Sequence, residues 1–250
     1  MDLGIEGRVA LVLGASKGIG RGIAAALARE GARVAIASRS RGELEDAAGE
    51  IEGEVRAFPA DTGDPKRMGE LPGVVADALG PIEILILNTG GPPAGGALER
   101  SLEEWDGAFR SLVLAPVILA GAVVEGMRER RWGRIVNVAS SSVREPIPGL
   151  VLSNANRMAA VGFLKTLASE VAREGITVNT VATGQFATDR MGEIHGSLER
   201  AEALARERVP AGRSGKPEEY GDLVAFLCSE RAGYLTGAVI PLDGGLLRSP

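Results

Sequence analysis

The sequence has very little of what metal centres and disulfide frameworks need. It holds one cysteine, Cys228, and one histidine, His195. A single cysteine excludes an internal disulfide and suits a reducing compartment, and the two residues lack the spacing of a zinc site. We therefore expect no metal in the functional site and a cytoplasmic location.

Basic clusters and long apolar runs are also missing. The formal net charge is −5, from 28 basic and 33 acidic side chains. An acidic chain without a basic patch excludes nucleic acid as an expected partner. No uninterrupted apolar run reaches the roughly 18 residues that span a bilayer, and no apolar leader follows Met1. We therefore expect no membrane partner.

The 250 residues are 45% hydrophobic, and short apolar runs alternate with helical stretches. The predicted strands are 9–13, 34–37, 55–58, 82–87, 134–139, 177–182 and 238–242, and the predicted helices are 21–30, 41–52, 64–79, 101–130, 153–173 and 217–229. Continuously apolar strands are covered on both faces. The pattern thus predicts an α/β fold of Rossmann type, a three-layer, doubly wound parallel sheet of seven strands with helices on both faces.

We predict a single dinucleotide-binding domain, 1–250, without linkers or repeats. The segment at about 184–215 has no strand pattern and carries a charged, helix-like stretch, 197–208. It is predicted to be a lid insertion over the substrate; a helical surface insertion fits its composition equally well.

A glycine-rich turn follows the first strand. Gly14, Gly18 and Gly20 stand at GxxxGxG spacing, directly before an Ala-rich helix. Strand, glycine turn and helix together present backbone N–H groups and the positive end of a helix dipole to a phosphate. The same glycines also fit a tight turn without a ligand, because short glycine motifs occur by chance.

The end of the second strand predicts which dinucleotide binds. It carries Ser38 and Arg39 and no acidic residue that would accept hydrogen bonds from an unphosphorylated ribose. Arg39, with Lys17 of the glycine turn, fits a 2′-phosphate, so we expect NADP rather than NAD; a solvated surface arginine is the alternative. Asp61 follows the third strand and either accepts from the adenine amino group or caps the helix that starts near 64.

Motifs along essentially the whole chain resemble the short-chain dehydrogenase/reductase family, and within it the β-ketoacyl-acyl-carrier-protein reductases. The glycine turn matches the family's TGxxxGxG with Leu13 for Thr, and 88–90 matches the end of its NNAG. Residues 175–184 match the strand before its PG motif, with Thr183 for Pro, and 215–219 and 235–245 match its C-terminal hallmarks.

The resemblance implies a set of cofactor-binding residues. Together with the residues above, these are Gly14, Ser16, Lys17, Gly18, Ile19, Gly20, Ser38, Arg39, Asp61, Thr62, Asn88, Gly90, Arg157, Gly184, Phe186 and Thr188. Thr188 stands where the family holds the nicotinamide carboxamide. The resemblance also implies a dimer or tetramer, built on the apolar helices 101–130 and 153–173. The same faces also suit packing on the sheet.

The chain departs from the family at its catalytic positions. The family uses a Tyr as general acid, a Lys four residues later, a Ser that polarises the carbonyl and an Asn that anchors a water. In this register Ser153 replaces the Tyr, Arg157 the Lys and Leu112 the Asn, and Ser140 alone is kept. The implied catalytic residues are Ser140, Ser153 and Arg157. Serine is a far weaker acid than tyrosine, whose pKa is about 10, and Arg157 holds its proton too tightly to relay it.

Three functions remain open on this basis. The first is an NADP-dependent oxidoreductase that reduces a small carbonyl substrate, apolar or of 3-oxoacyl type, through a non-standard acid. The second is a catalytically silent nucleotide-binding protein that acts as a sensor or partner subunit. The third is lyase or isomerase chemistry in the same cleft, with the two serines and Arg157 holding an anion. His195, Tyr220 and Tyr234 are the side chains that could replace the lost acid.

Overall fold

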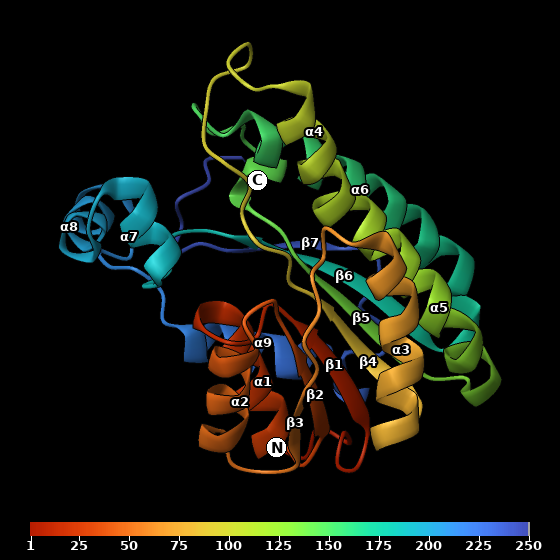
Figure 1. Cartoon of the computed structure of the whole chain (residues 1–250). Coiled ribbons are helices and arrows are strands. Elements are labelled where there is room, and N and C mark those ends of the chain that lie inside the picture. The colour runs from red at the N-terminus through yellow and green to blue at the C-terminus, as the bar shows by residue number, and fades with distance from the viewer. Residues whose placement is uncertain (250) are drawn as a thin grey trace.

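Seven parallel strands form the centre of the molecule (Figure 1). The computed structural model describes residues 1–249, so the last residue of the predicted domain, Pro250, lies outside it. The sheet order is β3-β2-β1-β4-β5-β6-β7. The strands are β1 (Val9–Leu13), β2 (Arg33–Ala37), β3 (Val55–Ala57), β4 (Ile82–Leu87), β5 (Gly133–Val138), β6 (Ile176–Thr183) and β7 (Val239–Leu242). The predicted doubly wound sheet is confirmed.

The strand order reverses beside β1, which pairs with β2 on one side and with β4 on the other. All five residues of β1 are buried, as expected for a continuously apolar central strand. In an open parallel sheet a crevice forms where the order reverses, beyond the carboxyl ends of the strands. Gly14 and Asn88 directly follow β1 and β4 and therefore meet at this point.

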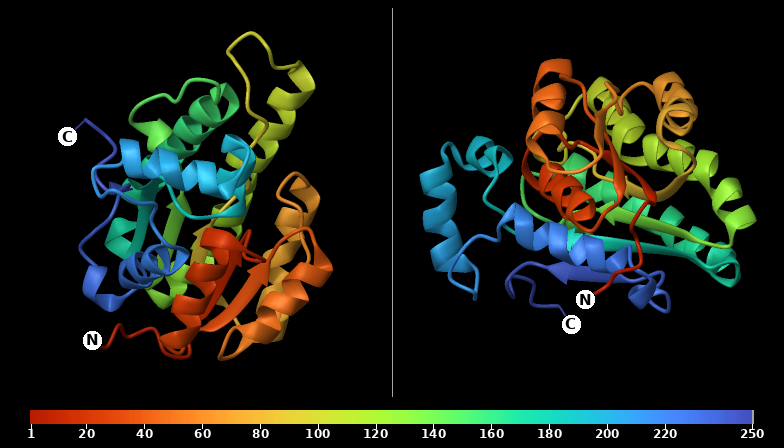
Figure 2. Two further views of the ribbon diagram at one scale, coloured as in Figure 1. Left: turned by 90° about the vertical axis from the view of Figure 1, so that its left-hand side faces the viewer. Right: turned by 90° about the horizontal axis from the view of Figure 1, so that it is seen from below.

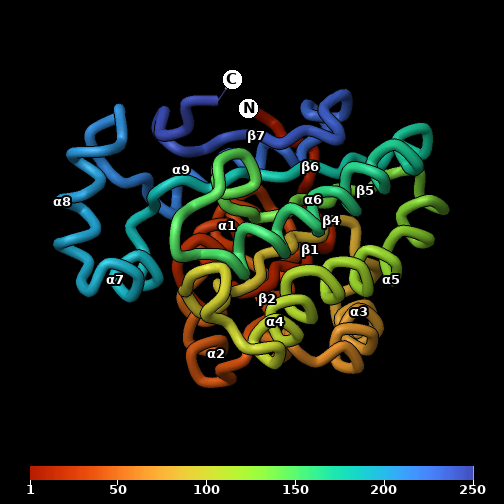
Figure 3. Tube along the Cα trace, turned by 90° about the horizontal axis from the view of Figure 1, so that it is seen from above, coloured from red at the N-terminus to blue at the C-terminus, as the bar shows by residue number. Residues whose placement is uncertain are grey.

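Helices cover both faces of the sheet, which makes the three layers (Figures 2 and 3). The helices α1 (Gly18–Arg29), α2 (Arg41–Glu50) and α9 (Pro217–Leu227) pack on one face, around Ile23, Val34 and Val224. The helices α3 (Pro65–Leu79), α5 (Ala115–Arg130) and α6 (Val151–Val171) pack on the other. Short 3₁₀ turns stand at Ser141–Val143, Ala172–Glu174 and Glu230–Ala232.

The predicted helix 101–130 is three consecutive segments. The helix α4 (Leu102–Phe109) passes through a π-helical turn, Arg110–Leu114, into α5. By length and composition Leu102–Arg130 is apolar enough to cross a membrane, but half of its most apolar window is buried inside the fold. Leu119 and Val123 of α5 belong to the core beneath the sheet, so the apolar character of this segment is accounted for in part by packing.

The segment between β6 and α9 is helical, as predicted. It contains α7 (Asp189–His195) and α8 (Leu198–Arg208) and no strand within the described residues, apart from an isolated bridge between Phe186 and Gly215. The two helices contact each other and project from one end of the sheet (Figure 3). We call residues 184–215 the lid segment below.

Candidate active site

A cavity of about 1730 Å³ opens at the carboxyl ends of the central strands. It brings together most of the predicted site residues. Those that line it are Gly14, Lys17, Gly18, Ile19, Gly20, Arg39, Asn88, Gly90, Ser140, Ser153, Arg157, Gly184, Phe186 and Thr188. Four predicted residues do not line it, namely Ser16, Ser38, Asp61 and Thr62.

The glycine turn is packed so tightly that side chains are excluded. Gly14 and Gly18 have φ of +57° and +56°, a region that side chains strain. A Cβ on Gly20 would stand 2.1 Å from the carbonyl oxygen of Gly14. Asn88 fixes the turn from β4, because its Nδ2 donates to the carbonyl oxygens of Leu13 and Gly14 at 3.1 Å each.

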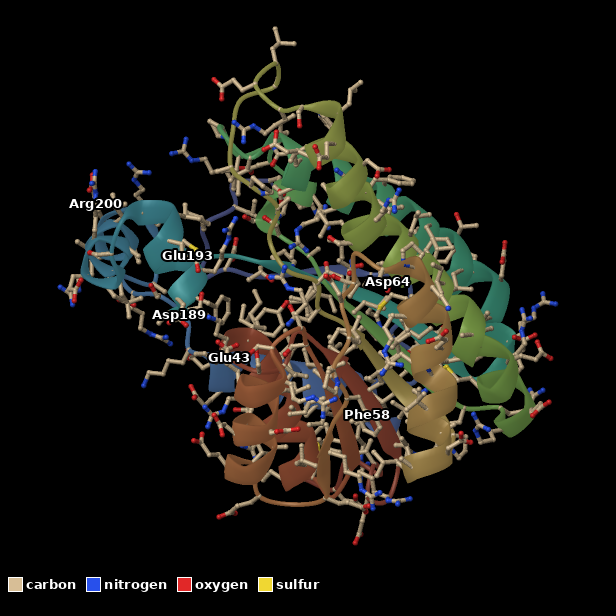
Figure 4. All side chains as sticks on the ribbon, viewed as in Figure 1. Glu43, Phe58, Asp64, Asp189, Glu193 and Arg200 are labelled. Carbon is tan, nitrogen blue, oxygen red and sulfur yellow. The ribbon has the colours of Figure 1, made fainter. Side chains whose placement is uncertain are left out.

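The first turn of α1 suits a phosphate. Its N-cap, Lys17, makes no side-chain capping bond, and no acidic residue stands in the first turn. The N–H groups there lack a capping acceptor, and the helix dipole adds positive potential. Lys17 Nζ lies 3.4 Å from Asp189 Oδ2 of α7. In Figure 4, Asp189 and Glu193 mark α7 beside this end of the sheet.

Open space continues along the cavity beside Gly90, where an added Cβ would meet nothing within 4 Å. The backbone donors at α1, the narrow glycine turn and this open stretch fit the elongated, anionic shape of a dinucleotide. The residues present therefore suit such a cofactor.

The first two residues after β2 are Ser38 and Arg39, and they differ in their access to the cavity. Arg39 is exposed, lines the cavity, and forms no ion pair with any residue in 1–249. Ser38 Oγ is buried without a hydrogen-bond partner in this part of the chain. Arg39 is available to an oxygen-rich substituent of a ribose, whereas Ser38 does not line the cavity.

Two predicted residues, Asp61 and Ser16, have local contacts instead. Asp61 Oδ1 accepts from the backbone N–H of Gly63 at 2.9 Å, in a turn. The alternative that Asp61 caps the following helix is wrong, because Asp64 does so by accepting from the N–H groups of Lys66 and Arg67. Ser16 Oγ lies 3.4 Å from Glu43 Oε2.

Arg157 crosses the opposite wall of the cavity. Its Nη1 donates to the carbonyl oxygen of Val138 at 2.8 Å, and its Nε donates to Ser153 Oγ at 3.2 Å. A longer contact of 3.4 Å joins Nη2 to the carbonyl oxygen of Gly90. These bonds tie α6 to the end of β5 and to the loop after β4.

The pKa of Arg157 is lowered to about 10, mainly by burial; Tyr220 opposes this shift, and the positive charge of Arg190 adds to it. The side chain is therefore protonated at neutral pH. It forms no ion pair with a carboxylate among residues 1–249, so its hydrogen-bond acceptors are all uncharged oxygens.

Ser140 stands on the same wall, at the end of β5. Its Oγ accepts from the backbone N–H of Ser142 at 3.1 Å. Ser153 is 8% exposed and its Oγ accepts from Arg157. Both serines line the cavity, and each is an acceptor in its protein contact, which leaves its O–H proton free for another partner.

The tyrosines stand outside this wall. Tyr220 is fully buried in α9, and its hydroxyl lies 2.8 Å from Thr183 Oγ1, which does line the cavity. Burial raises the pKa of Tyr220 well above its usual range. Tyr234 is fully exposed and does not line the cavity. His195 lines the cavity from the end of α7.

Leu112 is also absent from the cavity lining. It is 2% exposed, in the π-helical turn between α4 and α5. Leu112 is therefore a buried apolar side chain at the position where the resemblance implies an asparagine that anchors a water molecule.

The structure adds wall residues that the sequence did not single out. Arg190 of the lid segment donates through Nη2 to the carbonyl oxygen of Pro92 at 2.8 Å. The C-terminal residues 245–248 line the cavity, and Glu145 Oε1 holds this tail by accepting from the N–H groups of Arg248 and Ser249. Arg144, the neighbour of Glu145, donates to the carbonyl oxygen of Val239. No local sequence signal marks such long-range backbone contacts.

Comparisons with known proteins agree with this arrangement. Residues 14–247 match the family model described as enoyl-(acyl carrier protein) reductase. The chain is 34% identical over 244 residues to the 3-oxoacyl-acyl-carrier-protein reductase FabG of Vibrio cholerae, with 98% of this chain and 99% of that protein covered.

Two solved structures are similar over their whole length. L-sorbose reductase from Gluconobacter frateurii, in complex with NADPH and L-sorbose, superposes with a TM-score of 0.93 at 32% identity, and each chain is covered completely. A putative NAD(P)-dependent gluconate 5-dehydrogenase from Beutenbergia cavernae with bound NADP gives a TM-score of 0.92 at 34% identity, again with complete coverage.

Proposed function

Because the chain belongs to the short-chain dehydrogenase/reductase family, we propose that it is an NADP-dependent oxidoreductase that reduces a small carbonyl compound through Ser140, Ser153 and Arg157. The observation that carries the proposal is the juxtaposition in one cavity of the glycine turn, Arg39 and this hydroxyl-rich wall. Relatives that work with NADPH or NADP share the fold at TM-scores of 0.92 and above.

The cofactor end of the cavity selects the dinucleotide. Free N–H groups at the start of α1 receive the pyrophosphate. Arg39 and Lys17 receive the 2′-phosphate, because two cations suit a phosphate, and Lys17 exchanges its ion pair with Asp189 for it. When bound, the reduced nicotinamide supplies the hydride.

The substrate end orients and polarises the carbonyl. Ser140 and Ser153 donate to its oxygen with their free O–H protons. Arg157 strengthens Ser153 as a donor, since a charge-assisted hydrogen bond to Oγ draws electron density from the hydroxyl. Gly184, Phe186 and Thr188 line the cavity beside this wall, where they position the cofactor's ring and carboxamide.

The lid segment and the tail complete the pocket. Arg190 joins α7 to the loop at Pro92, and the 245–248 tail closes the side held by Glu145. We assign residues 184–215 as a substrate lid in one dinucleotide-binding domain that works in the cytoplasm. Pro146, Ile147 and Leu150 give this part of the cavity an apolar wall, which suits an apolar or acyl substrate.

We further propose that the protein is a homo-oligomer, a dimer or tetramer. Leu102 and Phe109 of α4 and Met158 of α6 are exposed large apolar side chains, with exposed fractions of 88%, 43% and 54%. Helices α4 and α6 are in contact with each other, so these side chains lie on neighbouring elements. Light scattering after size-exclusion chromatography tests this: a mass near that of one 25.9 kDa chain contradicts it.

The function is tested in two steps. Nicotinamide fluorescence is titrated first, and NADPH is expected to bind more tightly than NADH. NADPH consumption is then followed with a panel of carbonyl compounds that includes a 3-oxoacyl thioester, for the native protein beside the triple variant Ser153→Tyr, Arg157→Lys, Leu112→Asn.

Turnover by the native protein supports the proposed reductase. If the native protein binds NADPH but only the triple variant turns over, the result favours the second function, a catalytically silent nucleotide-binding protein that acts as a sensor or partner subunit. Failure to bind NADPH contradicts both.

A further inference from the structure

Two arginines from different elements reach the same loop of the cavity. Arg157 of α6 contacts the carbonyl oxygen of Gly90 through Nη2 at 3.4 Å, and Arg190 of α7 donates to the carbonyl oxygen of Pro92 at 2.8 Å. Both side chains line the cavity. Burial is the main cause that lowers the pKa of Arg157, and the positive charge of Arg190 adds to this shift, so the two charges act on each other. An anion that enters the cavity between them relieves this repulsion.

Both guanidinium groups keep N–H donors that no protein acceptor among residues 1–249 uses. A guanidinium has five N–H donors. Arg157 uses three of them in the contacts described above. Arg190 uses two, one to Pro92 and one to Glu193 Oε2 at 3.2 Å. The flat fork of the remaining donors matches the two oxygens of a carboxylate.

The acidic side chains around this pair are weak competitors for it. Glu193 lies three positions after Arg190 on α7, and both side chains are more than a third exposed, so their ion pair stabilises little. Glu145 also lines the cavity, but its Oε1 accepts from N–H groups of the C-terminal tail. Glu207 lines the cavity next to Arg208 in the sequence, so their charges offset each other. An incoming carboxylate therefore replaces Glu193 on Arg190 at small cost.

The two arginines lie beside the hydroxyl groups that our proposal assigns to the substrate carbonyl. Arg157 donates through Nε to Ser153 Oγ and reaches Gly90 through Nη2. A single guanidinium thus joins the carbonyl end of the site to the loop that Arg190 contacts. An anionic group bound by Arg190 is therefore only a short distance from a carbonyl group held at Ser153.

We infer that Arg190, assisted by the charge of Arg157, binds a carboxylate of the substrate, so that the compound reduced is a short oxo acid. This inference rests on the proposed function, since it specifies the class of carbonyl compound. Hydride passes from the reduced nicotinamide to the carbonyl carbon, and the carbonyl oxygen takes a proton from water. The products are a hydroxy acid and the oxidised cofactor, and the carboxylate itself does not react.

Paired substrates test the requirement for charge. NADPH consumption is measured with acetoacetate and levulinate and with their methyl esters, which keep the carbonyl group and remove the negative charge. For the better of the two acids, kcat/KM is expected to exceed that of its ester at least about 10-fold, because the ester loses a hydrogen bond between charged groups. If neither acid exceeds its ester, the inference is overturned and the proposed reductase stands.

The variant Arg190→Gln separates recognition of charge from closure of the lid segment. Arg190 also joins α7 to the loop at Pro92, and loss of that contact alone affects acid and ester alike. We expect kcat/KM to fall at least about 10-fold for the acid and much less for the ester. Arg173→Gln, which removes an exposed arginine outside the cavity lining, is expected to change neither. Equal losses for acid and ester assign Arg190 to closure of the lid and overturn the inference.

Binding of the acids is also measured without turnover. Calorimetry gives the Kd of acetoacetate and levulinate for the native protein in the absence of cofactor. Arg190→Gln is expected to raise the Kd of the better ligand at least about 10-fold, and Arg173→Gln is expected to leave it unchanged. No binding of either acid, or equal binding by the native protein and Arg190→Gln, overturns the carboxylate site.

These outcomes distinguish the inference from the proposed function. Turnover that uses acid and ester equally contradicts the inference alone. Binding of an acid that depends on Arg190, without NADPH consumption for any of the four compounds, keeps the carboxylate site and contradicts the proposed reductase.

Discussion

Arg157 donates through Nε to Ser153 Oγ at 3.2 Å, one helical turn earlier on α6. The resemblance in the sequence implies that this pair stands at the positions of the family's acid and its cationic neighbour, where its chemistry differs from theirs. A guanidinium that donates to a serine hydroxyl strengthens that hydroxyl as a hydrogen-bond donor without making it an acid of useful strength. The predictions below follow from this relationship and from the contacts around it.

Replacement of Ser153 by alanine removes one donor to the substrate oxygen. We expect kcat to fall about 10²–10³-fold, the usual effect of losing one oxyanion donor, while the Kd of NADPH stays unchanged. Stopped-flow and steady-state assays measure both. Ser169→Ala is the matched control, since Ser169 is an exposed serine of the same helix. A kcat for Ser153→Ala equal to that of the control contradicts the assignment.

Activity should be lost at alkaline pH. Burial lowers the pKa of Arg157 to about 10, with Arg190 lowering and Tyr220 raising it. Because our proposal assigns catalysis to the charged form of Arg157, kcat is expected to be highest below about pH 10 and to fall as the pH rises through that value. A pH–rate profile of the native protein beside Arg157→Lys measures this. A profile in which activity rises with pH over the same range contradicts a catalytic cation.

Cofactor preference should depend on Arg39. Arg39→Ala removes a cation that no carboxylate in the described chain engages. We expect the Kd of NADPH to rise about 10-fold or more, because a charge-assisted hydrogen bond is lost, while NADH binding changes little. Fluorescence titration with both dinucleotides measures the difference. Equal weakening toward NADPH and NADH would assign Arg39 a structural role.

Acid should weaken the junction between the lid segment and α9. Arg213 donates to both carboxylate oxygens of Glu219, at 2.6 and 2.8 Å, and this bidentate pair lowers the pKa of Glu219 to about 2. The folded pKa lies below the unfolded one, so the contribution is complete above about pH 4.3 and is lost as pH falls toward 2.

Both side chains are largely exposed, which limits the contribution of the pair to a few °C in Tm at most, on the order of 2–4 °C for a chain of this size. Glu219→Gln is expected to lower Tm by that amount at pH 7 and to match the native protein near pH 2. A constant difference in Tm across this range contradicts the assignment.

The regular part of the fold was predictable, because burial on both faces of the sheet requires strands that are mostly apolar, and β1 is a continuous apolar run while β4 and β5 are predominantly apolar. The glycine turn was predictable for a different reason, since its backbone geometry and close contacts admit only glycine at Gly18 and Gly20. The position of Arg157 on the cavity wall followed from its i,i+4 spacing to Ser153 on one helix face.

Other parts of the site depend on contacts between distant segments. The hold of Glu145 on the C-terminal tail uses backbone N–H groups about a hundred positions away, and backbone donors carry no residue-specific signal. The same applies to Arg190, which bonds the carbonyl oxygen of Pro92. The alternative that Asp61 caps the helix is wrong because Asp64 also suits an N-cap, and only the geometry separates two nearby carboxylates.

The central claim is that this site reduces a carbonyl compound without the tyrosine that the resemblance implies for the family, and one comparison tests it most directly. NADPH consumption with a 3-oxoacyl thioester is measured for the native protein and for the triple variant Ser153→Tyr, Arg157→Lys, Leu112→Asn. We predict measurable turnover by the native protein and turnover at least about 10²-fold faster by the variant, since general acid catalysis returns with the tyrosine. Turnover by the variant alone would contradict the account.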